Sequence, residues 1–407
     1  MTNRAALRPD SLPTDLDGWR SFLHERCAGS LGEVRRLVDH LKQTPPGDPL
    51  DIIRAWNDVN LALQRAFSSA GVLSQVHPDE DIRTLAEAAE QEAQKVSTDL
   101  SLDLELFDLL SSVDVSRLDP GAARVLDHTL RDFRRAGVDQ DESTRQRLRG
   151  LAEKETALGQ ELSKNIRDSV LSVALDPDQL RGLPADYVAE HPAGDDGSVT
   201  VTTDYPDVQP FLAFAQDAGA RRKVMLAFNN RAWPDNDAIL TELLSLRAEH
   251  AGLLGYDGWP SFDAEVKMIG AGSAIARFID ETTASADESG RRDVATLLER
   301  MRIDDPHVGV IDRADATYYA EVVRREQYDV DSQLVRTYFD FDKVRSGLLD
   351  VTGRLFGLQY VRAPEATSWH EDVAGYDVHL DGEMLGRIYL DLHPRAGKYK
   401  HAAQFTL

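Results

Sequence analysis

Most of this sequence repeats its apolar residues every three or four positions, the spacing that aligns side chains along one face of an α-helix. The segment after Asp79 is typical, because its apolar residues recur in this way from Ile82 to Val96 and charged residues fill the rest. Pro78 suits the first turn of such a helix. The pattern predicts a mainly α-helical protein built from many amphipathic helices.

Two further helices are predicted, one with a signal for its N-terminus and the other with a signal for its C-terminus. Asp139 and Glu142 have the spacing of a capping box, and a run of apolar residues at helical spacing follows over 148–166. Another helix is predicted from about Asp237 to Leu254, with Gly255 at the position of a left-handed C-terminal cap.

Strand signals are confined to short stretches. Val199 and Val201 alternate with polar residues, and a long helical run begins near Pro210. We place a soft domain boundary there, with an N-terminal helical region at 1–210 and a second region at 211–407. A chain of 407 residues exceeds what one core usually organises, so two or more lobes are expected.

The clearest strand signal lies near the end, where Asp381-Gly382 forms a favoured two-residue hairpin turn. The returning strand has two faces. We expect the apolar one to be core and the other to be available for chemistry or solvent. The apolar face holds Met384, Ile388, Leu390 and Leu392, and the other holds Arg387, Tyr389, Asp391 and His393. Residues 401–407 alternate like another half-buried strand, and a chain that stops there is expected to be truncated at its C-terminus.

Composition excludes several classes of protein. The formal net charge of −24 repels phosphate backbones and anionic lipid surfaces, so nucleic acid is not an expected partner. The single cysteine, Cys27, permits no intrachain disulfide and has no activating neighbours. Residues 1–17 lack the apolar stretch of a signal peptide, and nothing approaches the length of a membrane span. We therefore expect a cytoplasmic protein with no membrane partner.

From Tyr318 onward the sequence resembles a known family, and earlier blocks agree more loosely. The later blocks are Tyr318-Tyr319, Tyr328, Asp331, Tyr338-Phe339, Leu355-Phe356-Gly357, Trp369-His370, the run from Leu385 to Leu392, Pro394-Arg395, Gly397-Lys398 and His401-Ala402-Ala403. The earlier ones are Val76-His77-Pro78, Gly182-Leu183-Pro184, the run from Ala227 to Arg231, Leu246-Arg247, Glu249-His250-Ala251, Leu254-Gly255-Tyr256 and Lys267-Met268. In these blocks the chain resembles the thimet oligopeptidase and oligopeptidase A family of zinc peptidases. His393 and Ala396 depart from it, standing where the family tends to carry an aromatic and an acidic residue.

The resemblance implies a mainly helical, two-lobed fold flanking a deep channel that admits short peptides, with a small β-sheet near the cleft. It also implies a zinc cofactor for the complete protein, held by H-E-x-x-H on a helix. In that motif the two histidines reach one metal, and the glutamate acts as general base on the zinc-bound water. In the family the motif lies some tens of residues beyond the block at His401.

The motif is absent from these 407 residues. His24-Glu25 and His370-Glu371 are the nearest approaches, and neither is followed by the second histidine. We assign no catalytic residue and no metal ligand. The region 211–407 is interpreted as the first part of a peptidase catalytic domain, inactive alone and missing a C-terminal segment. The alternative is a non-catalytic helical protein that binds peptides or partners on the same scaffold.

Five residues are predicted to bind substrate: Gly386, Tyr389, Asp391, Arg395 and His401. An extended peptide could add to the edge of the last strand, and Gly386 marks either close backbone approach or a bulge. Arg395 could receive a peptide carboxylate. Ordinary ion pairing is the alternative for Arg395 and the favoured interpretation for Lys398, and a structural role is the alternative for His401.

Two other groups are interpreted as structural. Tyr318-Tyr319 and Trp369 are predicted to lie in the core. A separate metal site is disfavoured because its ligands are poorly spaced along the sequence. That site would use His370, Glu371, Asp372, His379 and His393.

Overall fold

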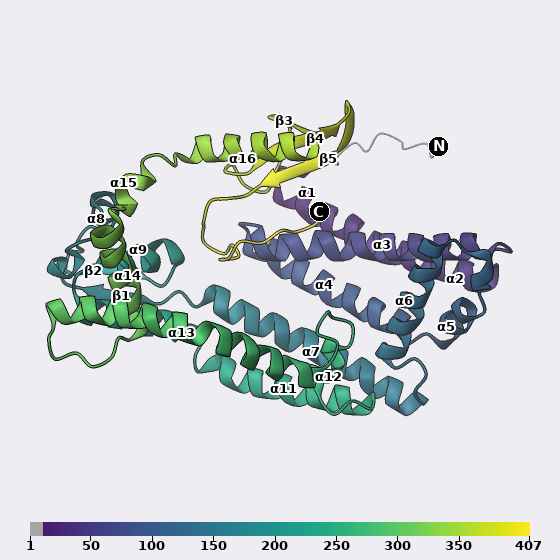
Figure 1. Cartoon of the computed structure of the whole chain (residues 1–407). Helices are drawn as coiled ribbons and strands as arrows, with labels where there is room; N and C mark the ends of the chain where they lie inside the picture. Colours follow the sequence, from purple (N-terminus) through teal and green to yellow (C-terminus); the bar gives the residue numbers. More distant parts are fainter. Residues whose placement is uncertain (1–10) are drawn as a thin grey trace. The chain divides into compact units, whose positions relative to one another are not determined.

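The computed structural model describes residues 11–407, and these are almost entirely helical with two small antiparallel sheets (Figure 1). This confirms the mainly α-helical prediction. The expectation of no signal peptide over 1–17 falls largely outside the described residues. The chain divides into two compact units, which are described separately below. Unit 1 contains residues 11–164, 238–262 and 357–407, and unit 2 contains residues 165–237 and 263–356.

Unit 1 is a layered helical body with a three-stranded sheet. Helices α2, α3 and α4 pack side by side and bury one continuous core, to which Trp369 and Val373 also belong. Its helices are α1 (Leu16–Leu23), a π-helical stretch at His24–Gly29, α2 (Ser30–Gln43), α3 (Pro49–Val76), α4 (Glu80–Ser101), α5 (Leu104–Ser111), a 3-10 turn at Val115–Arg117, α6 (Pro120–Ala136), α7 (Glu142–Asp168), α11 (Asp235–Leu253) and α12 (Trp259–Ala264). The last residues of α7 and α12 and the first of α11 belong to unit 2.

Unit 2 buries a smaller core around the two-stranded sheet and helices α9 and α10. Its elements are β1 (Ser172–Leu175), a 3-10 turn at Pro177–Leu180, α8 (Ala185–Glu190), β2 (Val199–Thr202), α9 (Tyr205–Phe214), α10 (Ala218–Asn229), α13 (Gly272–Asp304), α14 (Arg313–Tyr328), α15 (Ser332–Arg336) and α16 (Phe341–Phe356). Arg221 is almost fully buried in this core, where it pairs with Asp315 and donates to the carbonyl of Ala215 at 2.7 Å. Pro210 lies inside α9, and the domain boundary at 210 stays a prediction.

The predicted helices are present, with one cap reassigned. The helix after Asp79 is α4, and the Asp79 carboxylate accepts from the Ile82 backbone N–H at 3.1 Å. Gly255, with φ of 81°, follows α11 in the left-handed conformation, as expected. At α7 the cap is Asp141 instead of Asp139, because the Asp141 carboxylate accepts from the Thr144 N–H at 2.8 Å.

The predicted hairpin is also present. Strands β4 (Ala374–Leu380) and β5 (Glu383–Leu390) flank Asp381 and Gly382, both with positive φ, as a two-residue turn between twisted strands requires. Strand β3 (Leu358–Arg362) pairs with the other side of β4, giving the order β3-β4-β5.

The predicted strand at the end of the sequence is wrong. Residues 401–407 form no strand and are exposed. The alternation of Ala403, Phe405 and Leu407 suits a strand, but a strand also needs a neighbour to accept its backbone hydrogen bonds. None of the described residues supplies one.

Candidate functional site

Strand β5 lies at the edge of its sheet. Within residues 11–407 it pairs with β4 alone, so one row of its backbone groups has no strand beside it. Its pairing is irregular near Gly386, because Val378 pairs with Gly386 but His379 pairs with Met384, which leaves Leu385 as an extra residue. This is a β-bulge, the alternative considered for the glycine. A side chain at Gly386 would meet nothing within 4 Å, so the strand offers open space there.

The faces of β5 are not divided as the alternation predicts. The Tyr389 ring lies 5.5 Å from the Trp369 ring and packs against the helical core of unit 1, while Leu392 lies beyond the strand and is 52% exposed. The polar face can pack inward because its charges are neutralised locally. Arg387, for example, donates to Asp377 on β4 at 2.6 Å. The prediction of an apolar core face and an open polar face is therefore wrong.

Asp391, directly after β5, is the centre of a hydrogen-bonded cluster. Its carboxylate accepts from Trp369 Nε1 at 2.8 Å, from both Arg395 Nη atoms at 2.7 and 2.8 Å, and from Lys398 Nζ at 2.9 Å. Its side chain is only 9% exposed. Burial alone would raise the pKa of Asp391, but the bonds from Arg395, Lys398 and Trp369 outweigh it and lower the pKa from 3.8 to about 2.

The loop after Asp391 joins the sheet to the end of α3. Arg395 Nη2 donates to the Val76 carbonyl at 2.5 Å, and the Tyr399 N–H donates to the Gln75 carbonyl at 2.8 Å. These bonds satisfy carbonyls at a helix C-terminus, which the helix itself leaves without partners. We call residues 391–400 the anchor loop. It fixes the end of β5 against the helices of unit 1.

Gly397 brings the anchor loop close to α4. Its φ is 70°, and a Cβ at this position would lie 2.8 Å from Arg83 Nη1. Arg83, which is 9% exposed, donates to the carbonyls of His77 and Pro78 at 2.9 Å. A side chain at this point would therefore have to displace the Arg83 guanidinium as well as adopt a positive φ.

The structure brings three of the five predicted residues together. Tyr389, Asp391 and Arg395 meet around Trp369 and the end of α3, whereas Gly386 lies near the middle of β5. The ring of His401 lies 5.9 Å from that of Tyr399. Ordinary ion pairing with an acidic residue was the alternative for Arg395 and the favoured interpretation for Lys398. Both side chains do form such an ion pair, and the partner of each is Asp391. The five substrate-binding roles stay predictions.

Sequence reasoning missed the roles of Trp369 and the end of α3 in this cluster. Trp369 is buried, as predicted, and so is Tyr319, but the tryptophan also donates to Asp391. A usable signal existed, because Val76-His77-Pro78 and Pro394-Arg395 are both family-like blocks. Two family-like blocks far apart in the sequence can be in contact in the fold, and here Arg395 donates to the Val76 carbonyl.

The described residues do not fit a catalytic zinc site. No group of three His, Cys, Asp or Glu side chains within 11–407 is arranged to hold a metal ion. The Nδ1 atom of His370 accepts from the Asp372 backbone N–H at 3.2 Å. Burial raises the pKa of the Cys27 thiol to about 11, which keeps it protonated and a poor ligand or nucleophile.

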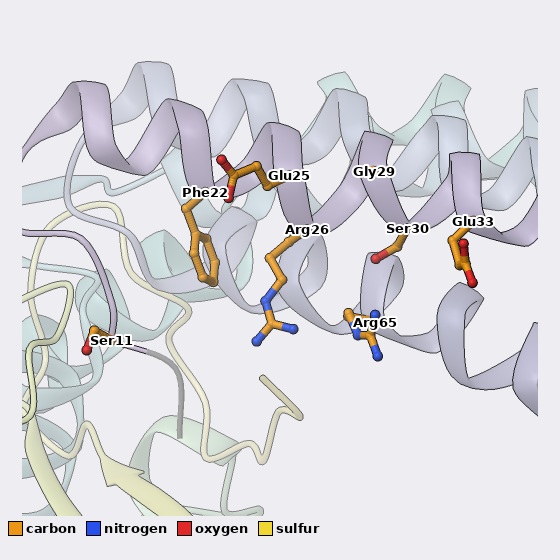
Figure 2. Close-up of a pocket in the computed structure, with 8 residues that line it drawn as sticks. All are labelled: Ser11, Phe22, Glu25, Arg26, Gly29, Ser30, Glu33 and Arg65. Carbon is orange, nitrogen blue, oxygen red and sulfur yellow. The ribbon is translucent and has the colours of Figure 1, made fainter. Parts of the chain in front are cut away.

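A pocket of about 570 Å³ lies on unit 1 beside the π-helical stretch (Figure 2). Arg26 and Arg65 extend into it, and the carboxylate of Glu33 is paired with Arg36 at 2.5 Å. Positive and negative groups share this pocket, so it selects neither charge, and it holds none of the five predicted residues. The pocket is lined by Ser11, Phe22, Glu25, Arg26, Gly29, Ser30, Glu33 and Arg65.

Among residues 11–407, no helix has the length and apolar character needed to cross a bilayer.

Comparison with known proteins finds a family match over the second half of the sequence and several similar relatives. Residues 211–407 match the profile of peptidase family M3. Saccharolysin of Saccharomyces cerevisiae is 27% identical over 95% of this chain and 58% of its own length. The thimet-like oligopeptidase of Dictyostelium discoideum is 27% identical over 87% of this chain and 55% of its own. Oligopeptidase A of Escherichia coli is 25% identical over 91% of this chain and 57% of its own length.

The match of residues 211–407 to peptidase family M3, together with these relatives, confirms the resemblance inferred from the motifs. The chain spans a little over half the length of the relatives that it matches.

Proposed function

We propose that this chain is part of a zinc-dependent metalloendopeptidase that cleaves short peptides. Residues 11–407 supply the helical scaffold and a strand that holds the substrate. The zinc ligands and the general base come from polypeptide outside these 407 residues. The match of residues 211–407 to peptidase family M3 supports this proposal, as do the oligopeptidase relatives. A cytoplasmic location remains part of the proposal.

The observation that carries the proposal is the edge of β5 within the region that matches the family. An extended peptide can pair with such an edge through main-chain hydrogen bonds, which bind many sequences alike. A strand that binds in this way must be held firmly, because each loosely ordered group lowers the affinity. The anchor loop meets that need, since Asp391, Arg395 and Lys398 tie the end of β5 to α3.

Gly386 allows a direct test. Its open surroundings accept a side chain in the folded protein, so Gly386→Val leaves the melting temperature within a few degrees of wild type. A peptide whose backbone approaches β5 closely at Gly386 would collide with the new side chain. We expect Gly386→Val to weaken binding of a labelled short peptide at least about tenfold, or about 1.4 kcal/mol. The measurement is fluorescence anisotropy.

The matched control is Gln359→Val, which places the same side chain at an exposed position of β3, the opposite edge of the sheet. It should leave peptide affinity unchanged. A second probe is the same peptide with its backbone nitrogens methylated, which cannot pair as a strand and should not bind. Equal binding by Gly386→Val and wild type, or by both peptides, would count against the proposed use of β5.

A further inference from the structure

His77 follows helix α3 directly, at the point where the anchor loop is attached, and is only 2% exposed. Its Nδ1 atom accepts a hydrogen bond from the Asp79 backbone N–H at 3.2 Å. A ring nitrogen that accepts a hydrogen bond carries no proton, so the imidazole in this position is neutral and its proton lies on Nε2. The Nε2 atom is buried as well, and no residue among 11–407 accepts a hydrogen bond from it.

Protonation of His77 would leave both of its ring N–H groups without an acceptor. A proton on Nδ1 would point at the Asp79 backbone N–H, which is itself a donor, and Nε2 already has no acceptor. The Trp19 ring of α1, whose centroid lies 5.0 Å away, packs against the imidazole and brings no charge. A buried cation without hydrogen-bond partners is strongly disfavoured. The charged ring therefore fits only if the turn that begins at His77 opens.

Charged groups face His77 from two elements. Arg83 on α4 donates to the His77 carbonyl at 2.9 Å, and Arg395 of the anchor loop donates to the preceding carbonyl at 2.5 Å. Asp79 is also close, but its carboxylate already accepts from a backbone N–H in the first turn of α4. Burial lowers the pKa of His77 from 6.5, and the charges of Arg83 and Arg395 act in the same direction, while Asp79 opposes them.

The anchor loop is attached to the chain immediately beside this ring. It donates to the carbonyls of Gln75 and Val76, the two residues before His77. Gly397 of the loop lies against Arg83, the same side chain that donates to the His77 carbonyl. A change in the backbone at His77 therefore moves acceptors on which the loop depends.

We propose that His77 is a pH-sensitive switch for the anchor loop. Neutral His77 keeps the turn at 77–79 in the conformation to which the loop binds, and protonated His77 opens this turn and releases the loop from the end of α3. The released form takes up its proton near the ordinary pKa of 6.5, and the attached form does so only at lower pH. The attachment is therefore complete above pH 6.5 and weakens as the pH falls below it. This inference goes beyond the proposed function, because it concerns the loop and not the peptide.

The test compares the full 407-residue chain with His77→Asn. Asparagine does not titrate in this range, and its side-chain oxygen can accept from the backbone N–H two residues on, as in an Asx turn. Amide hydrogen exchange over 391–400 is measured at pH 7.5 and pH 5.5 and corrected for the intrinsic exchange rates. We expect protection of the wild-type loop to fall at least about threefold at the lower pH, since one proton can contribute up to about tenfold per pH unit. His77→Asn should lose no protection.

The matched control is His40→Asn, which removes an exposed imidazole from α2 and should respond to pH like wild type. Equal pH dependence in His77→Asn and wild type, or its disappearance in His40→Asn, overturns the proposal. Deuterium exchange at the C2 position of each histidine needs no variant, and in wild type it should show His77 titrating below pH 6.5. Titration of His77 at or above pH 6.5 also overturns the proposal.

Peptide binding is measured separately, by fluorescence anisotropy at the same two pH values. If the loop loses protection in acid and no peptide binds at either pH, the switch is supported and the proposed use of β5 is not. If peptide binds and the loop keeps its protection in acid, the proposed use of β5 stands and the switch is overturned.

Discussion

Helices α4 and α16 have the same kind of sequence pattern and opposite surroundings. On α4 the apolar positions Ile82 and Ala93 are fully buried in the core of unit 1, against α3. On α16 (Phe341–Phe356) the apolar residues Val344, Leu348, Val351 and Leu355 are between 47% and 71% exposed. Periodicity thus determines that each segment is a helix and which face is apolar. Whether that face is covered depends on elements elsewhere in the chain or in a partner.

Contacts from other parts of the chain also pack against the N-terminal end of α4. Asp79 caps the first turn, and Arg83 in that turn lies under Gly397 of the anchor loop. Residues far apart in the sequence therefore close this end of the helix.

The largest expected effect is on the covered helix. Ile82→Ala removes a fully buried side chain and leaves a cavity, so we expect the free energy of unfolding to fall by about 3 kcal/mol. Urea denaturation followed by circular dichroism measures it. Leu85→Ala, on the same helix but 44% exposed, is the control and should cost less than about 1 kcal/mol. Equal losses would show that α4 is not packed as described.

These two helices also show how far the sequence alone can predict this molecule. The apolar spacing was sufficient for α4, and Asp381-Gly382 was sufficient for the hairpin, because both signals are local. The pairing of Asp391 with Trp369 was not predictable, since it depends on how distant segments fold together. The failed strand at 401–407 has the same cause, because alternation predicts a strand but not its neighbour.

The next effect concerns the anchor loop, whose hold on the end of α3 and on α4 depends on the ionised Asp391. The pKa of Asp391 is about 2 in the folded chain and near 3.8 when unfolded. This stabilisation is therefore complete above pH 4 and is lost as the pH falls from 4 to 2. It amounts to about 2 kcal/mol.

The measurement is urea denaturation at pH values from 6 to 2.5, on wild type and Asp391→Asn. We expect the variant to be less stable at pH 6 and the difference to shrink toward pH 2.5. The control is Asp58→Asn, which removes an exposed carboxylate from α3 and should leave the stability close to that of wild type throughout. A difference between Asp391→Asn and wild type that is constant with pH would show that the carboxylate charge does not hold the loop.

A smaller effect is expected from Gly397→Ala, which inserts a methyl group against Arg83. Part of the cost comes from the positive φ and part from the contact at 2.8 Å. Gly255→Ala separates the two, because Gly255 has φ of 81° but nothing within 4 Å of a Cβ. We expect Gly397→Ala to cost about 1 kcal/mol more than Gly255→Ala. Equal costs by urea denaturation would mean that Arg83 moves aside freely.

The smallest effect is expected on the uncovered helix. Leu348 is 56% exposed, so Leu348→Ala removes few contacts and should change the free energy of unfolding of the isolated chain by less than about 0.5 kcal/mol. A large loss of stability in the isolated chain would mean that α16 is already covered, and the contrast with α4 would then disappear. A small loss would show that α16, unlike α4, gains little stability from contacts of this side chain.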